Sequence, residues 1–344
     1  MILVDSVYIN NSGGKFLLEY FIRTLIEKRL IENYYFLIDE RLSSEYIQLL
    51  PGRHIIVKAS EYTRRREYTN LKNKAKIQKV LTLNNIPPPI TLECPVYIFF
   101  QNVLLIDANS YNLGFRIKLQ FYLKSLYSKF LNKKNYVWLV QTELNKQLLE
   151  IKYKIKQNNV NVLPFFDPNI KINDFHTLKE EIFIYIAHGI KYKNHKLLFT
   201  VWKKLANEFN LFPILVVTID KDLFPELSAE IIELNAMGLN IQNVGQIDKI
   251  EINKLYSRAK YLIYPSLTES FGLPLIEAVS FDCKVISIDL PYIRQVVTPS
   301  LEFDPNDCDD LTKKLKELII EKFELKNSTI NVKDEIDALI NILQ

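Results

Sequence analysis

The chain has 344 residues, of which 48% are hydrophobic and 24% are charged, and its formal net charge is +4. This composition excludes a disordered chain, and the length suits two domains of ordinary size. The three cysteines, Cys94, Cys283 and Cys308, form no close pair, so we expect free thiols in a reducing cytoplasm. The longest apolar runs are far shorter than the roughly 20 residues that span a bilayer, and the acidic residue in the first predicted strand argues against a secretory signal.

Charge is divided unevenly along the chain. Residues 1–163 contain 24 Lys and Arg against 13 Asp and Glu, a net charge of +11, whereas residues 164–344 contain 20 against 27, a net charge of −7. A basic first half favours an anionic partner, such as a membrane surface or a phosphorylated acceptor, over a nucleic acid. A solvated basic surface without any partner is an equally good interpretation.

Short apolar runs alternate with helical patterns in the first half, at residues 2–9, 35–38, 54–57, 96–100, 137–140 and 160–163. This alternation predicts a doubly wound parallel sheet, which binds ligands at the carboxyl ends of its strands. The first such end reads INNSGGKFLLEYFI, where Ser12 or Gly13 can cap a helix and the pair Gly13 and Gly14 leaves room for a diphosphate. A plain helix start explains it equally well, and no GxGxxG dinucleotide fingerprint is present.

Two basic segments follow in the first half. Residues 59–81 contain Arg64, Arg65 and Arg66 in succession, which predicts either a solvated helix face or a segment that contacts an acceptor or a membrane. Residues 108–142 contain six basic and no acidic side chains, interspersed with aromatic ones. At 100° per residue these basic side chains spread around a helix, which argues against a clean membrane-surface helix and favours packing with basic side chains at the rim.

The stretch LPFFDPNIKINDF separates two strand signals and reads as a linker. We therefore expect a first domain at residues 1–163, a linker at 164–178, a second Rossmann-like domain at 179–325 and a helix in 326–344 that packs back on the first domain. Asp220 and Asp222 follow a strand at residues 212–219 and could hold Mg²⁺ or Mn²⁺. Such a pair arises easily by chance, and the four histidines show no metal-ligand spacing, so no metal is expected.

Residues 261–289, YLIYPSLTESFGLPLIEAVSFDCKVISID, predict a strand, a loop, a helix and a second strand. Pro274 suits the first helical position, so the helix is expected at residues 274–281 with Glu277 in its first turn. The unpaired amides of residues 271–275 can face a phosphate, and Gly272 lets the backbone approach it. Glu269 and Glu277 could then bind a sugar and a vicinal diol, although a buried helix with two nearby carboxylates is the simpler alternative.

The framing ExFGLPxxEA after a Pro-Ser strand end resembles the donor-site signature of the retaining, nucleotide-sugar-dependent glycosyltransferases of family 4. The resemblance implies the GT-B fold, an α/β architecture of two Rossmann-like doubly wound domains facing a cleft. It also implies that Glu277 binds the nucleotide ribose and that Glu269 orients the donor sugar. The diphosphate would meet the segment formed by Ser270, Phe271, Gly272 and Leu273.

The same resemblance extends to other positions. Lys193, in KYKNHK, is similar to the family's lysine that meets the donor diphosphate, so Lys193 and Glu269 are the catalytic candidates. The arginine that relatives often carry a few residues earlier is missing. Gly245, in NVGQI, matches the position where relatives bring backbone to the base, and Gly13 with Gly14 matches their first glycine-rich loop.

The acceptor side departs from the family pattern. Many relatives have a histidine after about the fourth strand, where this chain reads YIFFQN, so Gln101 and Asn102 are expected to contact the acceptor instead. Arg64 and Arg65 are the other acceptor-binding candidates. Arg294 stands where relatives often have a glutamate, which leaves its partner open.

These features predict a metal-independent retaining hexosyltransferase without a cofactor, located in the cytoplasm or at the inner membrane face. Its expected partners are a nucleotide-sugar donor and a glycan or polyprenyl-pyrophosphate-linked acceptor, as in bacterial O-antigen or capsule synthesis. Three alternatives remain open: a GT-B-like sugar-nucleotide epimerase or hydrolase, a metal-dependent transferase that uses Asp220 and Asp222, and a sugar-nucleotide-binding protein without activity.

Overall fold

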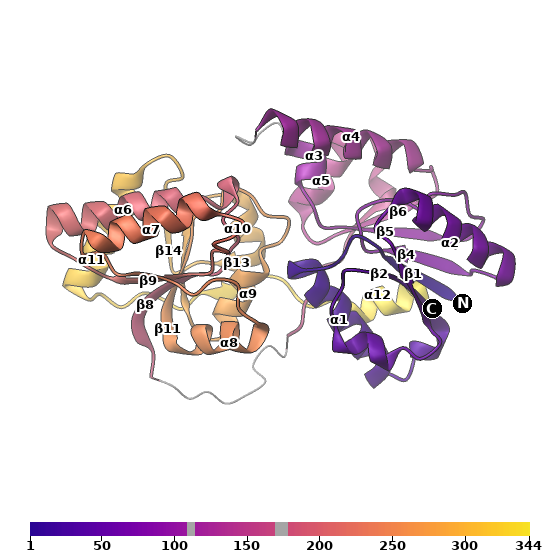
Figure 1. Ribbon diagram of the computed structural model, residues 1–344, viewed down its shortest axis with the longest axis horizontal. Coiled ribbons are helices and arrows are strands. Elements are labelled where there is room, and N and C mark those ends of the chain that lie inside the picture. The colour runs from indigo at the N-terminus through magenta and orange to yellow at the C-terminus, as the bar shows by residue number, and fades with distance from the viewer. Residues whose placement is uncertain (109–113, 169–177) are drawn as a thin grey trace. The chain divides into compact units, whose positions relative to one another are not determined.

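The computed structural model describes residues 1–108, 114–168 and 178–344 (Figure 1). They form two compact units, each built around a parallel sheet of seven or six strands. The first unit contains the described residues up to 167 together with Lys333–Gln344, and the second contains the described residues from 168 to 332. The predicted fold class, two Rossmann-like doubly wound α/β domains, is confirmed. Most of the expected linker, residues 169–177, lies outside the described residues.

The sheet of the first unit has the order β3-β2-β1-β4-β5-β6-β7, and every pair is parallel. Its strand order reverses between β1 and β4. A strand at the position of β4 was not predicted. The elements of this unit are β1 (Ile2–Ser6), α1 (Ser12–Glu27), β2 (Tyr34–Asp39), β3 (His54–Val57), α2 (Glu61–Lys74), β4 (Lys79–Thr82), β5 (Val96–Phe100), α3 (Leu104–Asp107), α4 (Phe115–Leu131), β6 (Val137–Val140), α5 (Glu143–Tyr153) and β7 (Val160–Val162).

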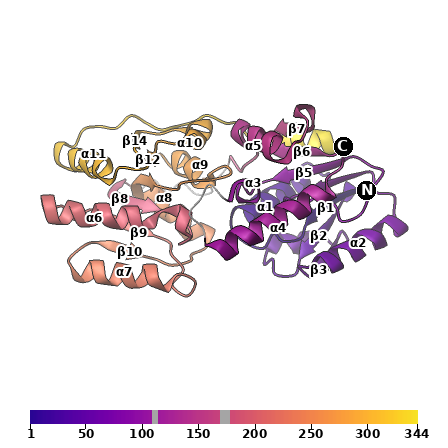
Figure 2. The same cartoon turned by 90° about the horizontal axis from the view of Figure 1, so that it is seen from above.

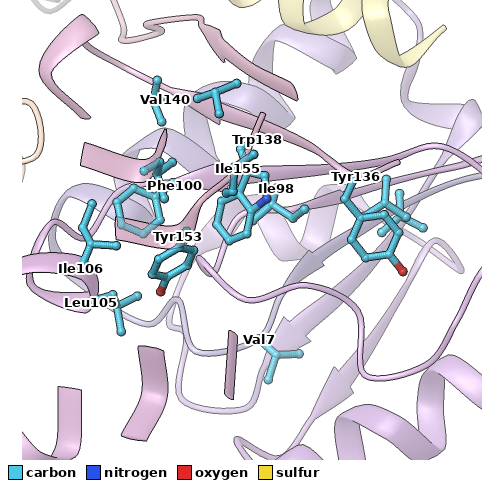
Figure 3. Packing of buried hydrophobic residues seen from close by; sticks show 14 of the residues in the cluster. Val7, Ile98, Phe100, Leu105, Ile106, Tyr136, Trp138, Val140, Tyr153 and Ile155 are labelled. Atoms are coloured by element: carbon cyan, nitrogen blue, oxygen red, sulfur yellow. The ribbon is translucent and has the colours of Figure 1, made fainter. Parts of the chain in front are cut away.

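The central strands of this sheet are apolar because helices cover both of their faces. Aromatic side chains fill much of the core on one side, as the close view in Figure 3 shows. The ring of Trp138 lies edge-on to that of Tyr153, with centroids 5.6 Å apart, and 6.1 Å from that of Phe100. Aromatic rings of β5 and β6 therefore pack against a ring of α5, which stabilises this helix on the edge of the sheet.

The last helix, α12 (Ile336–Leu343), belongs to the first unit. Figure 1 shows it in yellow among the indigo elements of that unit. Its buried side chains are Ile336, Leu339, Ile340 and Leu343. Asp334, just before the helix, accepts hydrogen bonds from the Tyr20 hydroxyl at 2.6 Å and from the backbone N–H of Phe166 at 3.1 Å.

The sheet of the second unit has the order β10-β9-β8-β11-β12-β14, again all parallel. The elements are β8 (Glu180–Tyr185), α6 (His195–Phe209), β9 (Ile214–Val217), α7 (Pro225–Ala236), β10 (Ile241–Asn243), α8 (Lys249–Arg258), β11 (Ala259–Tyr264), α9 (Leu273–Ser280), β12 (Lys284–Ile288), α10 (Pro291–Val296), β13 (Val297–Thr298), β14 (Leu301–Phe303), α11 (Cys308–Glu321) and β15 (Thr329–Ile330). Strands β13 and β15 form a separate antiparallel pair. Figure 2 shows α6 between α7 and α11.

The second sheet begins in its middle. The chain enters at β8, continues outward through β9 and β10, and then returns to β11 on the other side of β8. This makes the boundary between β8 and β11 the topological switch point, where the loops that follow the two strands diverge to opposite faces. Ligands of doubly wound sheets bind at such points, so these two loops are the expected ligand-binding loops of the second unit.

Candidate functional site

The loops after β8 and β11 meet at the switch point of the second sheet. The first loop ends in the 3-10 turn Lys191–Lys193, and the second carries Glu269 and Gly272. A backbone hydrogen bond of 2.8 Å from the N–H of Leu267 to the carbonyl of Tyr192 joins them. The fold thus brings together two predicted site segments that are about seventy residues apart in the sequence.

Lys193 and Glu269 form an ion pair at this junction. Both side chains are only 15% exposed, so solvent screens their attraction little. The same carboxylate oxygen, Oε1, also accepts hydrogen bonds from the Tyr264 hydroxyl at 3.0 Å and the Ser266 hydroxyl at 2.7 Å. These three donors all meet the same oxygen of Glu269.

Tyrosine and histidine side chains around the pair are held in their neutral forms. Burial, and then the charge of Glu269, raises the pKa values of Tyr185 and Tyr264 well above the usual range, so both remain hydroxyl donors. Burial, and then the charge of Lys193, lowers the pKa of His188, and the same causes lower that of His195 to about 3. The ionised groups at this junction are therefore the lysine and the glutamate.

Gly272 precedes α9 with φ +89°, a left-handed conformation that side chains disfavour. A Cβ atom there would lie 2.9 Å from Leu275 Cδ1 and 3.7 Å from the Tyr264 hydroxyl oxygen. The residue is thus packed against the group that binds Glu269. Helix α9 begins at Leu273 rather than Pro274, so Glu277 lies in the second turn, not in the first as predicted.

Glu277 is 9% exposed and forms an ion pair with Lys249, the first residue of α8. The charge of Glu277, after burial, raises the pKa of Tyr256. Lys249 was not predicted from the sequence, because a lysine at the start of a helix does not indicate a partner 28 residues away. Its one available signal was proximity to Gly245, which has φ +70° after β10. The pair links the predicted base-binding loop to the predicted ribose-binding glutamate.

The glycine-rich loop of the first unit lies beside Gln101. A Cβ atom on Gly14 would be 3.4 Å from Ile9 Cγ2 and 3.8 Å from Gln101 Oε1, so backbone and amide side chain approach closely. Gly13 also lies in the first turn of α1, and Asn11, rather than Ser12 or Gly13, occupies the capping position.

The predicted number of the strand before Gln101 needs correction. The strand before Gln101 is β5, the fifth rather than about the fourth strand, because β4 was missed. The fourth strand instead leads to Asn84, whose Nδ2 donates to the buried carboxylate of Asp5 at 3.0 Å. Asn102 accepts a hydrogen bond of 3.1 Å from the N–H of Leu104 and so helps to start α3.

The prediction that Arg64 binds an acceptor is wrong. Its side chain has no exposed surface, and its Nε donates to Asp5 at 2.7 Å. Its Nη2 donates to the backbone carbonyls of Ile86 and Pro87, each at 3.0 Å. A guanidinium in this position organises the end of β1 and the loop after β4. Arg65, the next residue, is exposed on α2.

Asp220, the first residue of the alternative metal motif, serves the backbone of its own loop. Its Oδ1 accepts hydrogen bonds from the N–H groups of Asp222 at 2.9 Å and Leu223 at 3.0 Å. Within residues 1–108, 114–168 and 178–344, no group of three or more His, Cys, Asp or Glu residues could hold a metal ion. Arg294, whose partner the sequence left open, pairs with Asp289 and Glu302.

A carboxylate, a lysine and a left-handed glycine thus lie at the topological switch point of the second sheet, where doubly wound sheets bind their ligands. Residues 167–334 match the family model of glycosyl transferases group 1. The O-antigen chain mannosyltransferase RfbU of Salmonella typhimurium is 24% identical over 194 residues, which cover 54% of this chain and 53% of that protein. The chain therefore matches about half the length of this relative.

Solved structures show the same fold at low sequence identity. The sucrose-phosphate synthase of Thermosynechococcus elongatus superposes with a TM-score of 0.71 at 14% identity, covering 93% of this chain and 90% of that one. Anabaena HepE in complex with UDP and glucose superposes with a TM-score of 0.65 at 11% identity, again covering 93% and 90%. No helix in the described parts of the chain is long and apolar enough to cross a membrane.

Proposed function

We propose that the protein is a retaining glycosyltransferase of family 4 that transfers a hexose from a nucleotide-sugar donor to a glycan or lipid-linked glycan. The observation that carries this proposal is the Lys193–Glu269 pair at the switch point, beside the left-handed Gly272 that opens α9. A relative that acts as an O-antigen mannosyltransferase and a neighbour that binds UDP and glucose support it.

In the proposed reaction, an acceptor hydroxyl oxygen forms a bond to the sugar C1 as the bond from C1 to the diphosphate oxygen breaks. The acceptor proton passes to the departing phosphate on the same face, so the anomeric configuration is retained. Negative charge grows on the diphosphate, and Lys193 together with the backbone N–H groups that follow Gly272 stabilises it. No metal is required in the proposed reaction.

Glu269 orients the sugar, and its three donors hold the carboxylate in place. Glu277 binds the ribose hydroxyls of the nucleotide, a role in which Lys249 holds the carboxylate in place before the donor arrives. The backbone at Gly245 meets the base. The proposed setting is bacterial surface polysaccharide synthesis, on the cytoplasmic side of the membrane.

The test is a donor screen with the whole chain against UDP-, GDP- and ADP-sugars, followed by transfer to a glycan acceptor with and without EDTA. We expect one donor class to bind, transfer to persist in EDTA, and Glu269→Gln and Glu277→Gln to slow it by at least about 100-fold. Donor interconversion or cleavage without acceptor would instead indicate an epimerase or hydrolase. Binding without turnover would indicate a non-catalytic protein, and wild-type rates in both variants would refute the site.

A further inference from the structure

Helix α4 of the first unit carries its large apolar side chains on the outside. Seven of the 21 large apolar side chains that are exposed among the described residues lie on this single helix of 17 residues, so they are concentrated rather than scattered. Phe115 and Phe130, near its two ends, are 80% and 79% exposed. The side chains buried on its inner face are instead two serines, Ser125 and Ser128.

The exposed apolar side chains form one stripe. At 3.6 residues per turn, six of them fall within an arc of about 100°. These six are Phe115, Leu119, Tyr122, Leu123, Leu126 and Phe130. The helix extends over roughly 25 Å at 1.5 Å per residue, and Figure 1 shows it above α3 and α5 in its unit.

Basic residues border this stripe on both sides. On the helical wheel, Arg116 adjoins the edge formed by Leu123, whereas Lys118 and Lys129 adjoin the edge formed by Tyr122. The prediction that this segment is not a membrane-surface helix was based on its basic residues alone, and these do spread around the axis of α4. The apolar residues define the outward face, and the exposed Arg116 lies where it would meet charged groups beside that face. The Lys129 ammonium instead lies 4.9 Å from the centre of the Tyr153 ring.

We propose that α4 docks the protein on the surface of an anionic lipid bilayer, with the six-residue apolar stripe inserted among the headgroups and the basic borders against them. Charge complementarity selects this partner, because α4 contains no acidic residue. Two copies of the chain that met through this helix would place like charges opposite each other. In the described parts of the chain, Arg116 forms no ion pair that would compete with a headgroup.

The test is flotation of the full-length chain with vesicles of phosphatidylglycerol and phosphatidylethanolamine, compared with vesicles of phosphatidylcholine. We expect the wild type to prefer the anionic vesicles and Phe115→Ser/Phe130→Ser to lower partitioning at least about tenfold. The matched control Ile232→Ser/Met237→Ser removes two exposed apolar side chains of the second unit and should bind as the wild type does.

Charge is tested with Arg116→Glu/Lys118→Glu, one residue from each border of the stripe, against the control Lys203→Glu/Lys313→Glu, and only the first pair should abolish the preference for anionic lipid. Vesicle binding is measured without donor or acceptor, so its result is separate from that of the transfer assay. Wild-type protein that ignores anionic vesicles, or stripe variants that float as well as the wild type, would overturn the proposal. So would a wild-type dimer that Phe115→Ser/Phe130→Ser converts to a monomer in light scattering, since a second copy would then cover the stripe.

Discussion

Gly272 offers a quantitative test of the site, because its conformation and its neighbours are both defined. Alanine at φ +89° in the left-handed region costs about 1–2 kcal/mol. The new methyl group would also lie 2.9 Å from Cδ1 of the buried Leu275, and overpacking of this kind adds roughly 1–3 kcal/mol. Gly272→Ala should therefore lower the free energy of unfolding by about 2–5 kcal/mol.

Gly238→Ala is the matched control, because Gly238 has φ +94° with no atom within 4 Å of its Cβ position. It should lose only the conformational part, about 1–2 kcal/mol. Denaturant unfolding gives both values, and titration calorimetry with the nucleotide sugar gives donor affinity, which we expect Gly272→Ala alone to weaken. Equal losses of stability and unchanged donor affinity in the two variants would refute the close-packed role of Gly272.

Three further outcomes follow from buried charges. In a double-mutant cycle, Lys193→Met and Glu269→Gln should couple by about 1–3 kcal/mol in unfolding free energy, and additivity would exclude a functional pair. Arg64→Met leaves a buried carboxylate unpaired and should destabilise the fold by about 3–5 kcal/mol, whereas the exposed Arg65→Met should change stability by less than about 0.5 kcal/mol; similar melting temperatures would contradict this. Burial lowers the pKa of His195 from its usual 6.5 to about 3 in the folded protein. As the pH drops from 6.5 toward 3, the unfolded chain binds a proton at His195 and the folded chain does not, so the free energy of unfolding decreases. This loss is roughly 2 kcal/mol at pH 5, and His195→Gln should remove it. A variant whose stability profile between pH 5 and 7 matches that of the wild type would contradict this expectation.

Local patterns predicted the parallel sheets well, and β3, β5 and β6 have the predicted bounds. Strand β4 was missed because it begins with Lys79 and follows a strongly basic helix. Its omission shifted the strand numbering and thereby the assignment of Gln101. A short central strand obtains its stability from its two neighbours in the sheet, which no local window contains.

Side-chain partners were less predictable than elements. Arg64 stands in a run of three arginines that reads as surface, yet its partner Asp5 lies 59 residues earlier in the chain. Lys249 meets Glu277 from another helix, so only the packed fold reveals the pair. In α4 the usual rule that apolar side chains face the core fails, since Ser125 and Ser128 fit the space against the unit.

The place of α12 governs how this chain can be dissected in the laboratory. Because Lys333–Gln344 completes the first unit, the described chain leaves this unit after residue 167 and returns to it at Lys333. A fragment that stops at residue 167 would uncover the apolar surface on which Leu339 and Leu343 rest. Producing the first unit alone would require a spliced gene in which residue 167 is connected by a short linker to Lys333, whereas the second unit can be excised as one continuous piece.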